Sequence, residues 1–135
     1  MGYGVVGCGG MTEVKGFRGL KVWNKTKDLA VKIYKITNDK SFNRDFSLKE
    51  QIRKSAISVV SNIAEAEGRE TNKDKIKFLF IAKGSLSELQ AQLQIAYEIG
   101  FISIGLYSSF NSEIEEIANM LGALIKVRKS SNEKK

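Results

Sequence analysis

The sequence predicts an all-α protein that folds as an up-down-up-down antiparallel four-helix bundle, and three observations support this prediction. Proline is absent from the 135 residues, so no predicted helix is interrupted. Apolar residues recur at spacings of three and four along four successive segments, which is the helical period. The connections between these segments are short, as in antiparallel bundles. We therefore expect one bundle domain at residues 15–129, a disordered glycine-rich leader at 1–14 and a basic disordered tail at 130–135.

The leader contains a motif that resembles a nucleotide-binding loop. Gly2, Gly4 and Gly7 follow the order G-x-G-x-x-G. Such a loop works when a strand delivers it and a helix presents its N-terminal amides to a pyrophosphate. No strand precedes Gly2 and no strand–helix–strand unit follows. We therefore reject a nucleotide site and expect residues 1–14 to be dispensable.

The first helix is expected between about Lys21 and Asn38. Its buried side would carry apolar residues at helical spacing: Val22, Trp23, Leu29, Ala30, Ile33 and Ile36. Trp23 is expected to be a core or interface aromatic. A polar, turn-like connection, KSFNRDF, follows this helix.

The second helix is expected to run from about Leu48 to Glu67. Ser47 and Glu50 have the spacing of a capping box ahead of the next apolar run. Gly68 can take the left-handed conformation that closes a helix. The buried side would carry Ile52, Ala56, Val59 and Ile63.

The third and fourth helices are expected to pack as antiparallel partners. Thr71 or Asn72 would cap the third helix, Gly100 would close it, and Ser103 would cap the fourth. The third helix has apolar residues in alternating steps of three and four: Leu79, Ala82, Leu86, Leu89, Leu93 and Ala96. The same steps recur in the fourth helix at Tyr107, Phe110, Ile114, Ile117, Leu121, Leu124 and Arg128.

A second set of apolar residues lies outside these seams: Ile57, Val60, Ile76, Phe78, Phe80 and Ile81. They cannot all face one bundle core. An exposed apolar band on a small helical protein usually marks a subunit interface, so we expect a homo-oligomer. The alternative is a broad buried face on the third helix, fully covered by its neighbours.

Composition disfavours most enzyme classes. Histidine is absent and Cys8 is the single cysteine, so the usual metal ligands and acid–base partners are missing. We expect no catalysis, no metal and no cofactor. Glu65 and Glu88 are expected to pair with Arg53 or Arg69, and Asn62 is expected to be a buried polar anchor. No apolar run approaches the roughly 20 residues that span a bilayer, and the start lacks a secretory signal, so we expect a cytoplasmic protein without membrane contact.

The net charge of +7 is unevenly distributed. Residues 15–83 hold 17 Lys and Arg against 8 Asp and Glu, whereas residues 84–125 hold five acids and no Lys or Arg. We expect one basic and one acidic half, with RNA or DNA as a partner of the basic half. Candidate contacts near the junction of the second and third helices are Arg53, Lys54, Arg69, Lys73, Lys75 and Lys77; a second set is Lys21, Lys25 and Lys32. The alternative is a solvated surface that keeps the protein soluble.

The segment QIRKSAISVVSNIAEAEGR, residues 51–69, resembles the four-helix-bundle proteins encoded by intervening sequences in bacterial 23S ribosomal RNA genes. The resemblance extends over residues 17–127, and the matched positions include Trp23, Ser61, Asn62, Glu65 and Gly68. Val60 stands where the family commonly has proline, and Ala66 where it has glycine. A straighter second helix is therefore expected.

The resemblance implies a ring, most simply a homopentamer, without established enzymatic chemistry. Its relatives include accessory proteins of diversity-generating retroelements, whose basic surface is thought to engage nucleic acid and a reverse transcriptase. The sequence therefore favours an RNA-binding accessory protein. The alternative is a scaffolding module that binds a protein partner such as a reverse transcriptase.

Overall fold

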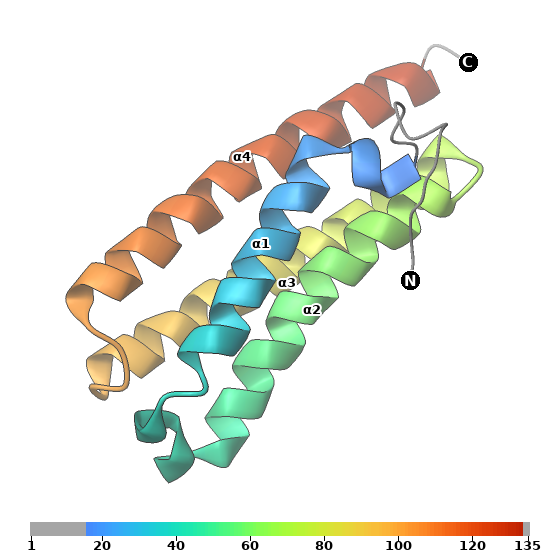
Figure 1. Ribbon diagram of the computed structural model, residues 1–135. Helices are drawn as coiled ribbons and strands as arrows, with labels where there is room; N and C mark the ends of the chain where they lie inside the picture. The colour runs from blue at the N-terminus through green and yellow to red at the C-terminus, as the bar shows by residue number, and fades with distance from the viewer. Residues whose placement is uncertain (1–15, 134–135) are drawn as a thin grey trace, which may run out of the picture.

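The computed structural model describes residues 16–133, with side chains to Ser131, and it contains four long α-helices. These are α1 (Lys21–Ile36), α2 (Phe46–Gly68), α3 (Asn72–Glu98) and α4 (Ile104–Glu133); two short 3₁₀ helices, η3 (Gly16–Gly19) and η4 (Lys40–Arg44), accompany them. Successive helices alternate in direction and lie side by side (Figure 1). The described residues contain no strand, so the all-α prediction is confirmed.

The predicted domain limits can be compared with the structure at the C-terminal end of the chain only. The leader at 1–14 lies outside the described residues. Helix α4 continues to Glu133, so residues 130–133 of the predicted disordered tail are helical. No helix in the described part of the chain is long and apolar enough to cross a membrane.

The N-terminus of α2 differs from the sequence prediction. The capping residue is Asp45, whose Oδ1 accepts a hydrogen bond from the Leu48 amide at 2.9 Å. The helix begins at Phe46, so Ser47 lies inside the first turn and its hydroxyl accepts from the Gln51 side chain at 3.4 Å. The prediction of a capping box formed by Ser47 and Glu50 is therefore wrong. A carboxylate at this position caps the free amides and also opposes the positive end of the helix dipole.

The C-terminus of α2 is closed by a lysine of the next helix. The helix ends at Gly68, but Gly68 does not take the predicted left-handed conformation; among the described glycines only Gly16 and Gly100 have positive φ. The Lys75 ammonium donates to the Glu67 carbonyl at 3.0 Å. A cation at this end interacts favourably with the unpaired carbonyls and with the dipole.

The other predicted caps are confirmed. The Thr71 hydroxyl accepts from the Asp74 amide at 3.1 Å, and the Ser103 hydroxyl accepts from the Leu106 amide at 3.1 Å. Gly100 has φ of 88°, and the Phe101 amide reaches back to the Ala96 carbonyl at 2.8 Å. This pattern is a Schellman motif, and it ends α3 where the sequence predicted.

The core follows the predicted seams closely. All six seam residues of α3 and all four of α2 are buried. In α4 the seam shifts near its end, because Ile125 is buried where a strict heptad would place Leu124. A straight helix drifts against a seven-residue repeat, so a long helix changes its buried column.

The core also includes Phe42, which the sequence pattern did not identify. Its side chain is 0% exposed and packs against the Phe101 ring, with 5.2 Å between centroids. Phe42 lies in η4, whose cap is Asp39. The Asp39 carboxylate accepts hydrogen bonds from both the hydroxyl and the amide of Ser41. These bonds, the hydroxyl bond most, lower the pKa of Asp39 below its ordinary value. A single short helix thus closes this end of the core.

The apolar residues outside the seam divide in two. Val60, Ile76 and Phe78 are half-buried, whereas Ile57, Phe80 and Ile81 are 43%, 45% and 42% exposed. Neighbouring helices of the same chain therefore do not fully cover this set. The alternative of a broad face on the third helix, fully covered by its neighbours, is therefore wrong for Phe80 and Ile81 of α3. Ile57 of α2 is exposed as well.

Candidate nucleic-acid interface

The six basic residues predicted near one junction do not form one cluster. Arg53 and Lys54 lie in the N-terminal part of α2. Arg69 follows the end of α2, and Lys73, Lys75 and Lys77 lie in the first two turns of α3. Arg53 and Arg69 are 16 positions apart, which corresponds to about 24 Å along a helix. The predicted single patch is therefore wrong as a spatial grouping.

Arg53 binds the C-terminal end of α1. Its Nε donates to the Thr37 hydroxyl at 2.8 Å, and its Nη2 donates to the Tyr34 carbonyl at 3.0 Å and to the Asn38 side chain at 2.9 Å. The guanidinium also lies over the Tyr34 ring, 4.5 Å from the centroid. We call this set of contacts the α1–α2 clamp. It uses three of the five N–H donors of the guanidinium, so fewer remain for a phosphate.

The α2–α3 turn offers fewer accessible cations than the sequence suggested. Arg69 forms an ion pair with Glu65 at 2.7 Å and lies over the Phe78 ring at 4.6 Å. Lys75 caps α2, as described above. Lys73 and Lys77 are exposed, and no described carboxylate forms an ion pair with either.

The predicted carboxylate pairs are confirmed in part. Glu65 pairs with Arg69, as expected. Glu88 has no ion pair with any described residue; it lies on a hollow between α2 and α3 beside Lys54, Ser58 and Gln92. A structural pairing therefore accounts for Glu65 alone.

The remaining motif residues have structural surroundings. The Asn62 side chain is half-buried and donates to the Ser58 carbonyl at 2.8 Å and to its hydroxyl at 3.1 Å, so it bonds within its own helix. Trp23 packs on Phe17 with 4.7 Å between ring centroids. Ser61 and Gly68 are exposed. None of the described residues forms a group of three or more potential metal ligands.

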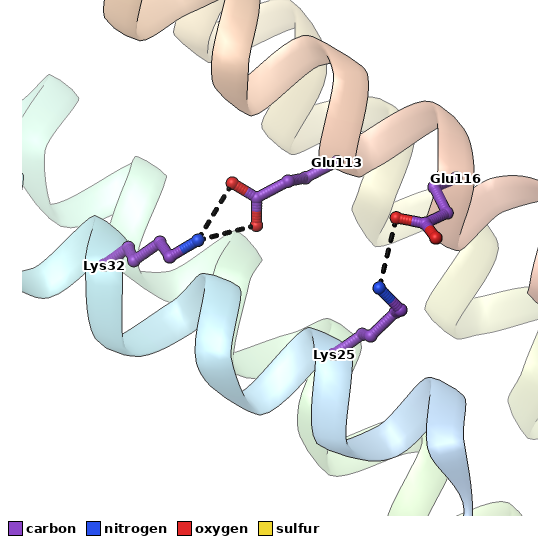
Figure 2. A network of polar contacts seen from close by, with 4 residues as sticks. All are labelled: Lys25, Lys32, Glu113 and Glu116. Atoms are coloured by element: carbon purple, nitrogen blue, oxygen red, sulfur yellow. Dashed lines mark hydrogen bonds and ion pairs between the residues drawn. The ribbon is translucent and has the colours of Figure 1, made fainter.

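Two lysines of the second predicted set, Lys25 and Lys32, pair with acids of α4, whereas Lys21 is exposed and forms no ion pair with a described residue. Figure 2 shows Lys32 bound to both carboxylate oxygens of Glu113, at 3.1 and 3.2 Å, and Lys25 bound to Glu116 at 3.2 Å. These acids belong to the segment that was expected to form an acidic half. They lie against basic α1 instead, so the prediction of separate basic and acidic halves is wrong along this seam.

The structure adds a basic site that the sequence analysis missed. Because α3 and α4 are antiparallel, the first half of α3 lies beside the last half of α4 (Figure 1). Between them is a hollow of about 500 Å³. It is lined by Phe80, Lys83, Gly122, Ala123, Ile125, Lys126 and Lys129, and we call it the α3–α4 groove.

Charge is one-sided in the α3–α4 groove. Its lining has three lysines and no carboxylate. Along α3, Lys77 precedes Phe80 by three positions and Lys73 precedes Lys77 by four, which places both lysines on the same side of that helix as Phe80. We call Lys73, Lys77, Lys83, Lys126 and Lys129 the basic end. The sequence held a signal for the basic end. The third and fourth helices were predicted to pair, and Lys83 and the basic stretch at 126–129 lie where the two helices meet.

Comparisons with known proteins agree with this architecture. The family described as 23S rRNA-intervening sequence protein matches residues 18–123. A crystal structure of a protein of unknown function from the S23 ribosomal protein family, from Bacteroides thetaiotaomicron, has a TM-score of 0.72 and 30% identity; the match covers 78% of this chain and 98% of that one. A comparison with curated proteins found no match. The resemblance noted in the sequence is thereby confirmed.

Proposed function

We propose that this chain, which belongs to the 23S rRNA-intervening sequence protein family, is a non-enzymatic accessory protein that binds RNA through its basic end. The observation that carries the proposal is the convergence of Lys73, Lys77, Lys83, Lys126 and Lys129 from two helices onto one end of the bundle. Lysines that contact phosphates supply affinity without reading sequence. The proposed binding is therefore sensitive to salt and weakly selective for sequence.

Two further features support an anion at this end. The first turn of α3 has amides with no partner inside the helix, and its dipole is positive there. Lys73 lies in that turn. The free amides of the helix end add positive potential to that of the lysines, and the Asp74 carboxylate in the same turn offsets part of it.

Assembly is part of the proposal. The exposed side chains of Ile57 and Ile81 favour association of copies, and the family resemblance implies a ring of about five. Each copy would present the same basic end. Several weak contacts to one strand would then add through effective concentration, so long RNA would bind more tightly than short RNA.

Charge reversal tests the RNA proposal. Lys73→Glu with Lys77→Glu should weaken binding to long RNA and lower the slope of log K against log salt by about 1.4, because each single-strand phosphate contact contributes about 0.7. The matched control is Lys40→Glu with Arg44→Glu, which reverses two exposed charges at the other end of the bundle. Equal losses from both pairs, or no binding at roughly 50 mM salt, would contradict the proposal.

A protein-binding scaffold is the second candidate function. Its support is an apolar surface at the other end of α3, where Ile95 and Ile99 are about half exposed beside Ala91 and Glu98. Such a surface fits a protein partner, for example a reverse transcriptase. Substituting Ile95 and Ile99 by Ser would abolish that partner's binding and leave RNA binding intact if the two functions are separate.

A further inference from the structure

Phe80 is placed unusually for a residue of its type. Its side chain is 45% exposed although it belongs to the long packing helix α3. Beside it, Gly122 and Ala123 of α4 provide little side-chain volume, so the ring faces an open hollow. A Cβ built on Gly122 would meet nothing within 4 Å, so close packing does not require glycine there. The α3–α4 groove is therefore a hollow with an accessible aromatic face.

Cations surround this aromatic ring. The Lys129 ammonium lies 5.2 Å from the ring centroid, and Lys83 and Lys126 line the same groove. An aromatic face among lysines, with no carboxylate in the lining, is complementary to a nucleotide: the ring can stack on a base while ammonium groups bind the flanking phosphates.

We propose that Phe80 is a base-stacking platform and that the α3–α4 groove selects single-stranded over double-stranded nucleic acid. This inference rests on the proposed RNA-binding function and adds the structural class of the ligand. A base in a duplex has both faces covered by its neighbours, whereas an unpaired base can enter the groove. The stacked base takes the position of the Lys129 ammonium over the ring, and that ammonium then pairs with a phosphate.

The test separates stacking from simple apolar contact. Phe80→Tyr keeps an aromatic face, whereas Phe80→Leu keeps an apolar side chain without one. We expect Phe80→Leu to weaken binding of an unstructured single-stranded RNA by about 5-fold to 100-fold, the range for loss of one stacked base, and Phe80→Tyr to bind within about 2-fold of the parent. Binding of a duplex of equal length should change in neither variant. Light scattering on each variant shows whether assembly is altered.

A fluorescent base gives a second readout. An RNA that contains 2-aminopurine should change its emission on binding to the parent protein and to Phe80→Tyr, and should lose most of this change with Phe80→Leu. Equal affinity of Phe80→Leu and Phe80→Tyr would overturn the stacking proposal, as would equal binding of duplex and single strand. Loss of assembly with Phe80→Leu, with RNA affinity per subunit retained, would assign Phe80 to a subunit contact instead.

These outcomes distinguish this inference from the broader proposal. If the reversals at Lys73 and Lys77 reduce binding but Phe80→Leu does not, the basic end binds RNA without stacking at Phe80. If no RNA binds the parent protein, both proposals fail together.

Discussion

The α1–α2 clamp leads to a prediction about Arg53 that separates a structural role from nucleic-acid binding. Arg53→Ala removes one half-buried hydrogen bond to Thr37, two exposed hydrogen bonds to Tyr34 and Asn38, and the contact with the Tyr34 ring. A hydrogen bond to a charged group contributes about 1.5 kcal/mol or more, exposed bonds less, and an exposed cation–π contact about 0.5 to 1 kcal/mol. The expected loss of unfolding free energy is about 3 kcal/mol.

Thermal and urea unfolding at fixed protein concentration measure this loss. For a chain of this length, about 3 kcal/mol corresponds to a decrease in Tm of roughly 10 °C. The neighbouring substitution Lys54→Ala is the control; Lys54 is exposed and makes no hydrogen bond with the described residues, so its loss should stay within about 0.5 kcal/mol. Arg53→Lys should recover less than half of the loss, because an ammonium cannot reach three acceptors in a fixed plane.

RNA binding completes the test. Because the Arg53 guanidinium is bound to α1, Arg53→Ala should leave the salt slope of RNA binding unchanged. If Arg53→Ala destabilises the protein no more than Lys54→Ala, the clamp does not stabilise the bundle. A reduced salt slope for folded Arg53→Ala would return Arg53 to the nucleic-acid interface.

Three further predictions concern local features. Asp45→Ala should lower the unfolding free energy by about 1 kcal/mol, whereas Ser47→Ala should change it by less than about 0.5 kcal/mol in the same urea titration, because Asp45 is the α2 cap. Gly100→Ala should destabilise by about 1 kcal/mol or more, since φ is 88° there; an unchanged Tm would refute that strain. A double-mutant cycle of Lys32→Ala and Glu113→Ala should give a coupling of about 0.2 to 1 kcal/mol that disappears at 1 M salt, and a salt-independent coupling would contradict an exposed ion pair.

The parts of the fold that were predictable depend on local information. The α3 seam and the caps at Thr71 and Ser103 depend on residues that are three or four positions apart. In a helix, residues at these spacings lie on one face, so the sequence alone identifies them. Asp45 and Ser47 are both good caps two residues apart, so the choice depended on how the chain leaves η4. Local pattern therefore fixed the helices and left one of their starts open.

The candidate site required information that spacing does not contain. Which lysines meet across α3 and α4 depends on the antiparallel register of two helices, and the target of Arg53 depends on where α1 ends against α2. The pairing of Lys32 with Glu113 likewise joins residues 81 positions apart. Composition showed the excess of positive charge, but only the packed bundle shows which charges already have partners.

The ion pairs of Figure 2 also bear on the order in which the bundle assembles. Helices adjacent in sequence provide most of the packing, whereas α1 and α4 meet more sparsely, across a hollow of about 140 Å³ lined by Lys25, Lys32, Glu113 and Glu116. Pairing sequence neighbours closes short loops and is fast; joining α1 to α4 closes a loop of most of the chain. Exposed ion pairs return little free energy for that closure. The α1–α4 seam should thus form last during folding and open first in native-state hydrogen exchange, with opening promoted by salt.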